Sequence, residues 1–243
     1  MKKTDLTNKK VLVTGASRGI GLEIANGLCS RGATVLGVAR SPRPASLNKN
    51  ISYKSCDLDD SDDVLSLISI LETEFNSIDG LINVAGISLP PSLPPETRFQ
   101  ETIRTNLVSV FNLTSQIIPL LKVGQASIVN ISSINSVLGF PDNPGYVASK
   151  AGLSGLSRAL ALDLAKLGIR VNTISPGYFP TNLTQVSFSS PSLNQERANR
   201  NLLKRWGRLE ELIGPVSFFI SSDSSFITGQ ELFVDGGWTI KGL

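Results

Sequence analysis

Tyr146 and Lys150 lie four positions apart at the start of a segment whose composition favours a helix. Residues at i and i+4 share one helix face, so the phenol and the ammonium can point into the same cleft. A phenol titrates near pH ~10 in water, and a nearby positive charge favours the phenolate. The pair therefore predicts a proton donor and acceptor that works near neutral pH. Two unrelated neighbours on a solvated helix would have the same spacing, so the rest of the chain must decide.

The composition narrows the chemistry, because the chain has no histidine. This excludes a Ser-His-Asp triad, a Cys-His dyad and every histidine-ligated metal site. We expect no metal, and we expect Cys29 and Cys56 to be buried free thiols in a reducing compartment. The net charge of +3 and the scattered basic residues predict no nucleic-acid partner. Without an apolar leader or a long apolar run, we expect a cytoplasmic protein that does not bind membranes.

Strand-like and helix-like segments alternate along the 243 residues. The expected strands are 10–14, 33–39, 51–56, 80–84, 127–132, 170–175 and 231–234, and the expected helices follow the first strand to about residue 30 and then cover 61–75, 96–121, 146–167 and 209–221. This alternation predicts an α/β fold, a single doubly wound Rossmann-type domain with a parallel sheet of about seven strands flanked by helices. We expect one domain over 1–243, with a cofactor-binding half to about 135 and a catalytic and substrate-lid half from about 136.

A glycine-rich turn joins the first strand to the first helix, with glycines at 15, 19 and 21. Backbone amides at a helix N-terminus can bind a pyrophosphate, and missing side chains let it approach. The spacing is Gly-x-x-x-Gly-x-Gly rather than the more general GxGxxG. The turn predicts a dinucleotide site. The segment 40–50 contains two prolines and leaves little room for a helix before the next strand.

Together these stretches resemble the short-chain dehydrogenase/reductase family over nearly the whole chain. The markers are TGASRGIG at 14–21, Asp57, NVAG at 83–86, Asn106, Ser133, Tyr146 with Lys150, and Pro176-Gly177. The resemblance implies nicotinamide-dependent hydride transfer at a carbonyl or hydroxyl group, without a metal.

The resemblance also implies roles for individual residues. Tyr146 would be the general acid in reduction and the base in oxidation, and Lys150 would lower its pKa and bind the nicotinamide ribose. Ser133, favoured over Ser132 by its spacing from the tyrosine, would hold the substrate oxygen, and Asn106 would support an ordered water. The implied cofactor contacts are Gly15, Ser17, Arg18, Gly19, Ile20, Gly21, Arg40, Asp57, Leu58, Asn83, Ala85, Gly86, Tyr146, Lys150, Pro176, Gly177, Phe179 and Thr181.

The end of the second strand predicts the cofactor. Members specific for NAD(H) carry an acidic residue there, whereas this chain has Ala39 followed by Arg40. Arg40 and Arg18 could clamp a 2′-phosphate, although both could also be ordinary surface arginines. We therefore expect NADP(H) to be preferred over NAD(H).

The segment 176–205 predicts a polar lid, because it is rich in Asn, Gln, Ser, Thr and Arg. Such a lid favours a small oxygen-rich substrate, and RWGR at 205–208 with VDGGW at 234–238 resembles sugar-acid and polyol dehydrogenases. The same core is similar to 3-oxoacyl carrier-protein reductases, which stay as the alternative. A non-catalytic dinucleotide-sensing regulator is the alternative of another class, but it should have lost one of the four catalytic residues.

The helix that carries Tyr146 also predicts self-association. Gly152, Gly155 and Ala159 recur at helical spacing beside a leucine stripe. Glycine inside a helix costs ~1 kcal/mol relative to alanine, so a close backbone contact is a reasonable compensation. We expect a second subunit there and a homo-oligomer, either a dimer or a tetramer.

Overall fold

One parallel sheet organises the computed structural model, which describes residues 4–241. Its strands are β1 (Lys10–Thr14), β2 (Thr34–Ala39), β3 (Ser52–Ser55), β4 (Gly80–Asn83), β5 (Ser127–Ile131), β6 (Arg170–Pro176) and β7 (Glu231–Val234). They lie in the order β3-β2-β1-β4-β5-β6-β7, and every neighbouring pair is parallel. The predicted α/β fold with a sheet of about seven strands is confirmed.

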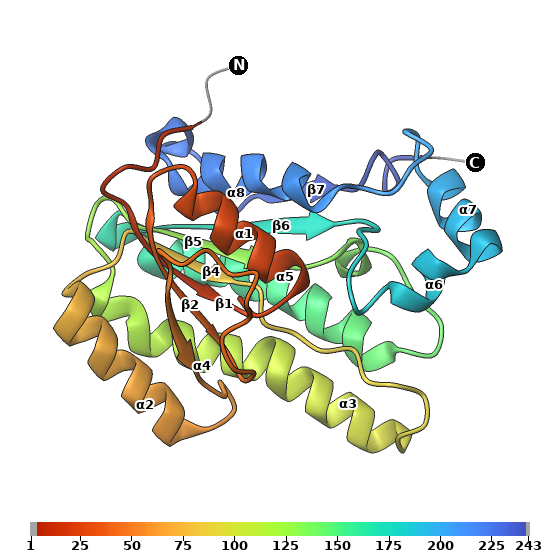
Figure 1. Cartoon of the computed structure of the whole chain (residues 1–243), viewed down its shortest axis with the longest axis horizontal. Coiled ribbons are helices and arrows are strands. Elements are labelled where there is room, and N and C mark those ends of the chain that lie inside the picture. The colour runs from red at the N-terminus through yellow and green to blue at the C-terminus, as the bar shows by residue number, and fades with distance from the viewer. Residues whose placement is uncertain (1–3, 242–243) are drawn as a thin grey trace.

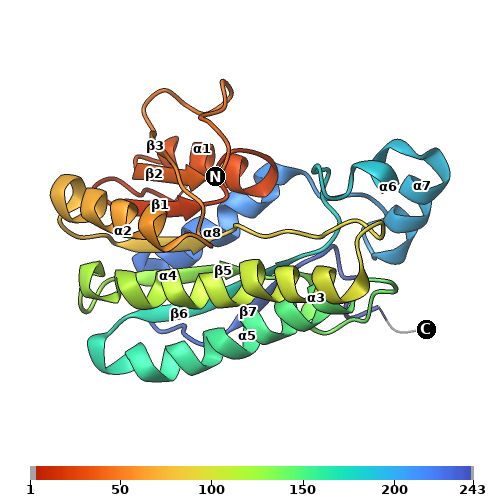
Figure 2. The same ribbon diagram turned by 90° about the horizontal axis from the view of Figure 1, so that it is seen from below.

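Helices cover both faces of the sheet (Figures 1 and 2). One layer holds α1 (Gly19–Cys29) and α8 (Ile213–Ile220), and the other holds α2 (Ser61–Ile70), α4 (Ser109–Ile117) and α5 (Pro144–Leu164). Successive side chains of each strand point alternately toward the two helix layers, as the pleat of a strand requires. In β1, Val11 and Val13 join the core under α1 and α8, whereas Leu12 joins the core on the other side.

The chain reverses direction across the sheet between β1 and β4. From β1 it proceeds outward to β3, and from β4 it proceeds the other way to β7. The connections that follow β1 and β4 run in opposite directions and leave a crevice at the carboxyl ends of these two strands. This crevice is the usual ligand position in an open α/β sheet. As expected, the connection between β2 and β3 has no helix, and Arg43 braces it by donating to the carbonyls of Asn48 (2.8 Å) and Ile51 (2.7 Å).

The single helix expected over 96–121 is interrupted. It consists of α3 (Pro95–Ile103), a π-helical turn (Arg104–Val108), α4 and a short 3₁₀ turn (Ile118–Leu120). A π turn accommodates one extra residue without ending the helix. Here Ser109 donates to the carbonyl of Arg104 (3.0 Å), and side-chain contacts described below hold both ends of the turn. The helix expected over 61–75 likewise ends in a π turn (Leu71–Phe75).

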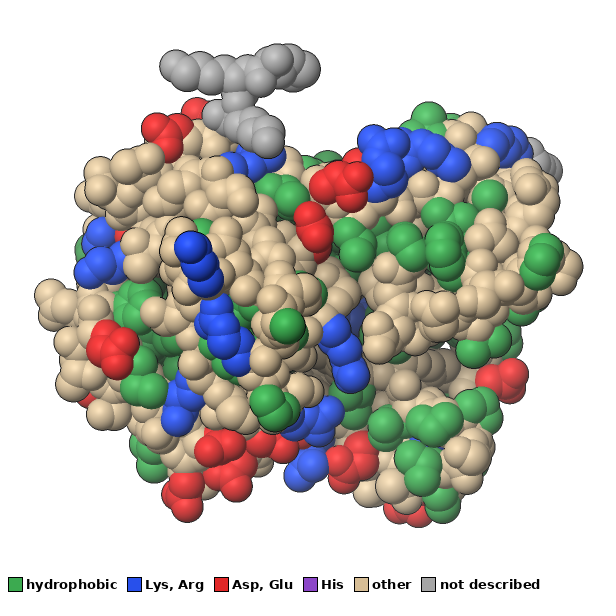
Figure 3. All heavy atoms as spheres, in the orientation of Figure 1, with side chains coloured by type: hydrophobic (Ala, Val, Ile, Leu, Met, Phe, Trp, Pro, Cys, Tyr) green, Lys and Arg blue, Asp and Glu red, His purple; other side chains and the backbone are tan. Residues whose placement is uncertain are grey.

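Two short helices, α6 (Gln185–Ser189) and α7 (Pro191–Arg200), form a separate lobe beyond the carboxyl ends of the strands (Figure 1). The face drawn in Figure 3 is hollowed between this lobe and the main body, and acidic and basic side chains are interspersed over it. Within residues 4–241, no helix is both long enough and apolar enough to cross a membrane.

The packing of α5 changes one expectation from the sequence. Leu153, Leu160 and Leu164 are buried against the sheet. A Cβ at Gly152 would lie 2.9 Å from Cδ2 of Leu107, so the close contact that this glycine allows is with the π turn of the same chain. Gly152 therefore needs no second subunit to explain it.

Candidate active site

The turn after β1 is built so closely against the turn after β4 that glycine is required. Gly15 has φ +69°, and a Cβ there would lie 2.9 Å from the Ala85 nitrogen. A Cβ at Gly21 would lie 2.2 Å from the Gly15 carbonyl oxygen. Thr14 joins the two turns, because its Oγ1 accepts from the amides of Val84 (3.0 Å) and Ala85 (3.1 Å). Two predicted cofactor-binding segments therefore share one wall of the crevice.

The N-terminus of α1 is open toward a ligand. Arg18 occupies the cap position with an extended backbone and makes no side-chain cap hydrogen bond. The first amides of a helix need partners from outside it, and their dipole favours an anion. Thr181, from the segment after β6, lies across this turn, with its Cβ 3.5 Å from where a Cβ of Gly19 would be. This cradle fits the pyrophosphate of a dinucleotide.

A second group of residues lies beyond the ends of β2 and β3. Arg18 and Arg40 are both exposed here, and Ser55 donates to the Arg40 carbonyl (2.9 Å). Tyr53, which was not predicted, donates from its hydroxyl to the Ser41 carbonyl (2.7 Å). Burial raises the pKa of Tyr53, and hydrogen bonding with Ser17 and the charge of Arg43 lower it. Tyr53 therefore contacts Ser41 and Ser17, the chain neighbours of the two arginines predicted to read the 2′ position.

The two predicted contacts after β3, Asp57 and Leu58, are both partly exposed but have different partners. Asp57 is partly exposed, and its Oδ1 accepts from the Asp59 amide (3.0 Å). Leu58 packs against the core beneath α2.

Three elements bring the four predicted catalytic side chains together. Tyr146 and Lys150 come from α5, Ser133 follows β5, and Asn106 lies in the π turn. Ser133 is hydrogen-bonded to the Tyr146 phenol. The Lys150 Nζ lies 5.7 Å from the centroid of the Tyr146 ring and donates to the Ile131 carbonyl (2.9 Å).

Asn106 connects these residues to the turn after β4. Its Oδ1 accepts from the Ile87 amide (2.7 Å), and its Nδ2 donates to the Ile87 carbonyl (2.9 Å) and to Ser149 Oγ (3.2 Å). A Cβ at Gly86 would lie 3.2 Å from Asn106 Oδ1 and 3.6 Å from Lys150 Nζ. The asparagine, the lysine and the glycine turn thus meet at one point.

The ionisation of the pair differs from the expectation. Burial raises the pKa of Tyr146, opposed by its hydrogen bond with Ser133, so the expected depression is not seen in this geometry. Burial also lowers the pKa of Lys150 to about 8. Both shifts have one physical cause, because a site shielded from water disfavours the phenolate and the ammonium alike. In this geometry the phenol therefore keeps its proton near neutral pH.

Two of the predicted cofactor contacts have side chains that are buried in the protein. Asn83 is buried and donates to Asn130 (2.8 Å) and Thr114 (3.3 Å), so its side chain faces the core rather than the crevice. Phe179 is also buried, with its ring against Gly207. Pro176 ends β6, and Gly177 follows it, where a Cβ would lie 2.9 Å from Asp235 Cα.

Ser132 and Ser133 have different environments. Ser132 Oγ donates to the Lys150 carbonyl (3.0 Å) and so helps to hold α5 on the sheet. Ser133 Oγ accepts from the Asn135 amide (3.2 Å) and faces Tyr146.

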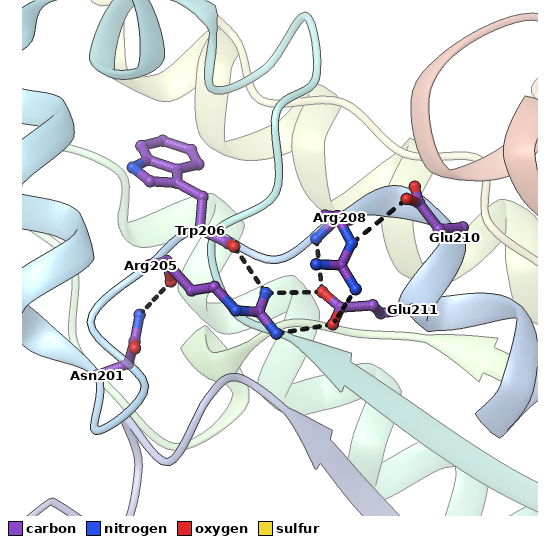
Figure 4. A network of polar contacts seen from close by, with 6 residues as sticks. All are labelled: Asn201, Arg205, Trp206, Arg208, Glu210 and Glu211. Carbon is purple, nitrogen blue, oxygen red and sulfur yellow. Dashed lines mark hydrogen bonds and ion pairs between the residues drawn. The ribbon is translucent and has the colours of Figure 1, made fainter.

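The end of the segment predicted to form a lid is held by a network of charged residues (Figure 4). Arg205 binds both carboxylate oxygens of Glu211, at 2.8 and 2.7 Å, and the Arg208 amide donates to the same carboxylate (2.7 Å). These contacts lower the pKa of Glu211 to about 2. The adjoining Asn201 donates to the Arg205 carbonyl (2.8 Å), so the segment after α7 is fixed to the start of the last helical segment.

The described part of the chain also shows whether its side chains could bind a metal ion together. Over residues 4–241, no group of three or more His, Cys, Asp or Glu side chains could hold a metal ion. Cys29 and Cys56 are both free.

Comparisons with known proteins agree along nearly the whole chain. The family model described as Enoyl-(Acyl carrier protein) reductase matches residues 15–239. The chain is 37% identical to 3-oxoacyl-(acyl-carrier-protein) reductase FabG of Chlamydia trachomatis, covering 96% of this chain and 98% of that protein. It is 34% identical to gluconate 5-dehydrogenase of Gluconobacter oxydans, covering 97% and 96%. The solved gluconate 5-dehydrogenase of Burkholderia cenocepacia, in complex with NADP and tartrate, superposes with a TM-score of 0.90 at 30% identity, covering 99% and 98%.

Proposed function

Because the chain belongs to the short-chain dehydrogenase/reductase family and is an oxidoreductase acting on CH–OH and C=O groups, we propose a specific reaction for it. The protein interconverts the ketone and the secondary alcohol of a small sugar acid or polyol, using NADP(H). The observation that carries the substrate class is the lid. The segment 176–205 lies at the active-site end and offers amide, hydroxyl and guanidinium groups. Polar groups at fixed positions select a hydroxylated substrate by leaving its competitors unpaired.

The cofactor would lie along the crevice, and the residues present fit it. Residues up to about 135 would supply most of the contacts, because the glycine turn and the uncapped start of α1 suit the pyrophosphate. From the second half of the chain, Lys150 suits the nicotinamide ribose. When bound, the nicotinamide supplies or accepts the hydride. Preference for NADP(H) is supported by Arg18 and Arg40, whose guanidinium groups suit a 2′-phosphate, and by the NADP bound to the Burkholderia relative.

The protein groups handle the proton and the substrate oxygen. Ser133 and Tyr146 both donate to that oxygen, and Tyr146 delivers its proton to it during reduction. In oxidation the same phenol accepts the proton. Lys150 and Asn106 hold the far side of the tyrosine and link it to the turn that ends in Gly86.

Reduction of a 3-oxoacyl thioester is the second candidate function. It is favoured by the Chlamydia relative, which is 37% identical. A panel of sugar acids, polyols and acetoacetyl thioesters, each assayed with NADP(H) and NAD(H), separates the two candidates. Turnover of sugar acids or polyols supports the proposal, and turnover of the thioester alone would overturn it.

We further infer a homo-oligomer. Val108 and Phe111 on the π turn and α4, and Leu162 on α5, are 43%, 45% and 80% exposed, so this surface offers apolar contact area to a second copy. Light scattering would distinguish dimer from tetramer, and a monomer at micromolar concentration would contradict the inference. A cytoplasmic location is proposed from the two unpaired cysteines.

A further inference from the structure

Arg197 connects the lid to the loop that carries the catalytic residues. It comes from α7, and its guanidinium carbon lies 5.4 Å from the ring centroid of Tyr178 and 5.9 Å from that of Phe140. Phe140 belongs to the segment between Ser133 and Tyr146, whereas Tyr178 follows β6. Stacking on two aromatic faces orients a guanidinium and leaves its N–H edges free to bind a ligand.

The two aromatic rings under this guanidinium belong to segments that adjoin the candidate catalytic residues. The charge of Arg197 lowers the pKa of Tyr178, which burial raises more strongly. The charge of Tyr178 in turn contributes to the raised pKa of Tyr146. The contacts with the Tyr178 and Phe140 rings place the guanidinium where the segment after β6 meets the loop between Ser133 and Tyr146.

The hydrogen-bonding capacity of Arg197 is only partly used. Its side chain is 16% exposed, and its buried Nε has no hydrogen-bond partner in the structure. One terminal nitrogen lies 3.3 Å from Glu196, but the same carboxylate oxygen accepts a shorter bond of 2.6 Å from Arg200. By contrast, Arg205 is bound through two nitrogens by Glu211. An anionic ligand would accept hydrogen bonds from the unused N–H groups of this largely buried cation and balance its charge.

A carboxylate matches this site best, because its two oxygens fit the planar fork of a guanidinium. We propose that Arg197 binds the carboxylate of the substrate while Tyr146 and Ser133 hold the oxygen that reacts. The site therefore favours hydroxy acids and keto acids over neutral polyols of the same length. This inference rests on the function proposed above and specifies its substrate class.

The test compares an aldonic acid with the neutral polyol of the same chain length, in the presence of NADP⁺. Arg197→Met should lower kcat/KM for the acid by about 10- to 100-fold and change that for the polyol by less than about threefold, because a hydrogen-bonded charge pair is lost only with the acid. Arg197→Lys should have a kcat/KM for the acid between those of the wild type and Arg197→Met, because lysine retains the charge but not the planar fork of the guanidinium. Arg200→Met is the matched control, since it removes a charge from the same helix but should preserve the ratio between substrates. Equal losses on acid and polyol, or the same selectivity change in Arg200→Met, would overturn the proposal.

A binding measurement separates this inference from the proposed function. Calorimetry with tartrate and NADP⁺-saturated protein should detect binding to the wild type and its loss in Arg197→Met, at unchanged NADP⁺ affinity and melting temperature. If the wild type oxidises sugar acids and Arg197→Met does so equally well, the carboxylate site is wrong and the proposed function stands. If tartrate binds through Arg197 but no sugar acid or polyol is turned over, the proposed function is wrong and the site stands. A wild type that neither binds tartrate nor prefers the acid contradicts the site.

Discussion

Thr105 donates a 2.7 Å hydrogen bond to the carboxylate of Asp59, which lies 46 positions earlier in the chain. The other oxygen of the same carboxylate accepts from Ser109. Asp59 therefore holds both ends of the π turn between α3 and α4, and Asn106 lies inside that turn. A residue next to the predicted adenosine side of the crevice thus positions a residue of the catalytic centre.

Asp59→Ala should displace Asn106 without touching the reacting groups. We expect kcat to fall by about 10- to 100-fold, because a shift of ~1 Å in a catalytic group can cost ~10²-fold. Cofactor affinity should change little. In a double-mutant cycle, Asn106→Ala should add almost nothing to Asp59→Ala, since both changes disable one unit. Asp62→Ala, an exposed acid on α2, is the control, and additive losses would contradict the coupling.

Tyr146→Phe and Lys150→Ala should damage different properties. Removing the phenol hydroxyl should lower kcat by about 10²- to 10⁴-fold, the usual worth of a general acid or base, and leave cofactor affinity nearly unchanged. Removing the amine should lower kcat and also weaken cofactor binding, because we propose that Lys150 binds the ribose. Stopped-flow kinetics and fluorescence titration with NADPH measure the two effects. Equal cofactor affinity in both variants would argue against this division.

Arg40→Asp should move the cofactor preference toward NAD(H). We expect kcat/KM with NADP(H) to fall by about 10- to 100-fold, because a charge-assisted hydrogen bond is replaced by repulsion. The value with NAD(H) should stay the same or rise. Arg43→Asp is a useful comparison, since that side chain is occupied with the carbonyls of Asn48 and Ile51. Wild-type protein that uses both cofactors equally well would contradict the prediction.

The buried Lys150 should make the unfolding free energy rise with pH in the alkaline range. Its pKa is about 8 in the folded protein against 10.5 as the reference value. Between these values the unfolded chain holds a proton that the native state has released, so stability increases with pH. Urea unfolding of wild type and Lys150→Met at pH ~7.5 and ~9.5 isolates this contribution from the tyrosines and cysteines that titrate nearby. The same pH dependence in both proteins would show that Lys150 is not responsible.

Glu211 should stop stabilising the segment after α7 only at acidic pH. Glu211 has a pKa of about 2 against a reference value of 4.5. Its contribution is therefore complete above pH ~4.5 and is lost as pH falls toward ~2. The Glu211 side chain is partly exposed and lies at the surface, so the effect should appear locally, as faster proteolysis between α7 and α8 rather than as global unfolding. Glu211→Gln should already be susceptible at neutral pH. Equal susceptibility of wild type and variant at pH ~5 would contradict this role.

The sheet and the grouping of the candidate catalytic residues could be predicted because their signals are local. β1, β4 and β5 are short runs of buried, mostly apolar residues, and the distances in sequence between Ser133, Tyr146 and Lys150 indicate a shared site. The π turn could not be predicted, because its two ends are held by Asp59 from a distant loop. The burial of the Asn83 side chain depends on Asn130 of a neighbouring strand. The contact between Arg197 and Phe140 likewise exists only once the lid is placed on the body.

The π turn also constrains how the gene can change in length. A π turn holds one residue more than the α-helical turn that could replace it. Deleting one residue from 104–108 would therefore join α3 and α4 in one regular helix and keep Leu113 and Ile117 in the core. The same deletion would withdraw Asn106 from its hydrogen bonds with Ile87 and Ser149. Descendants of this sequence could lose that residue and keep the fold, but not the position of the asparagine.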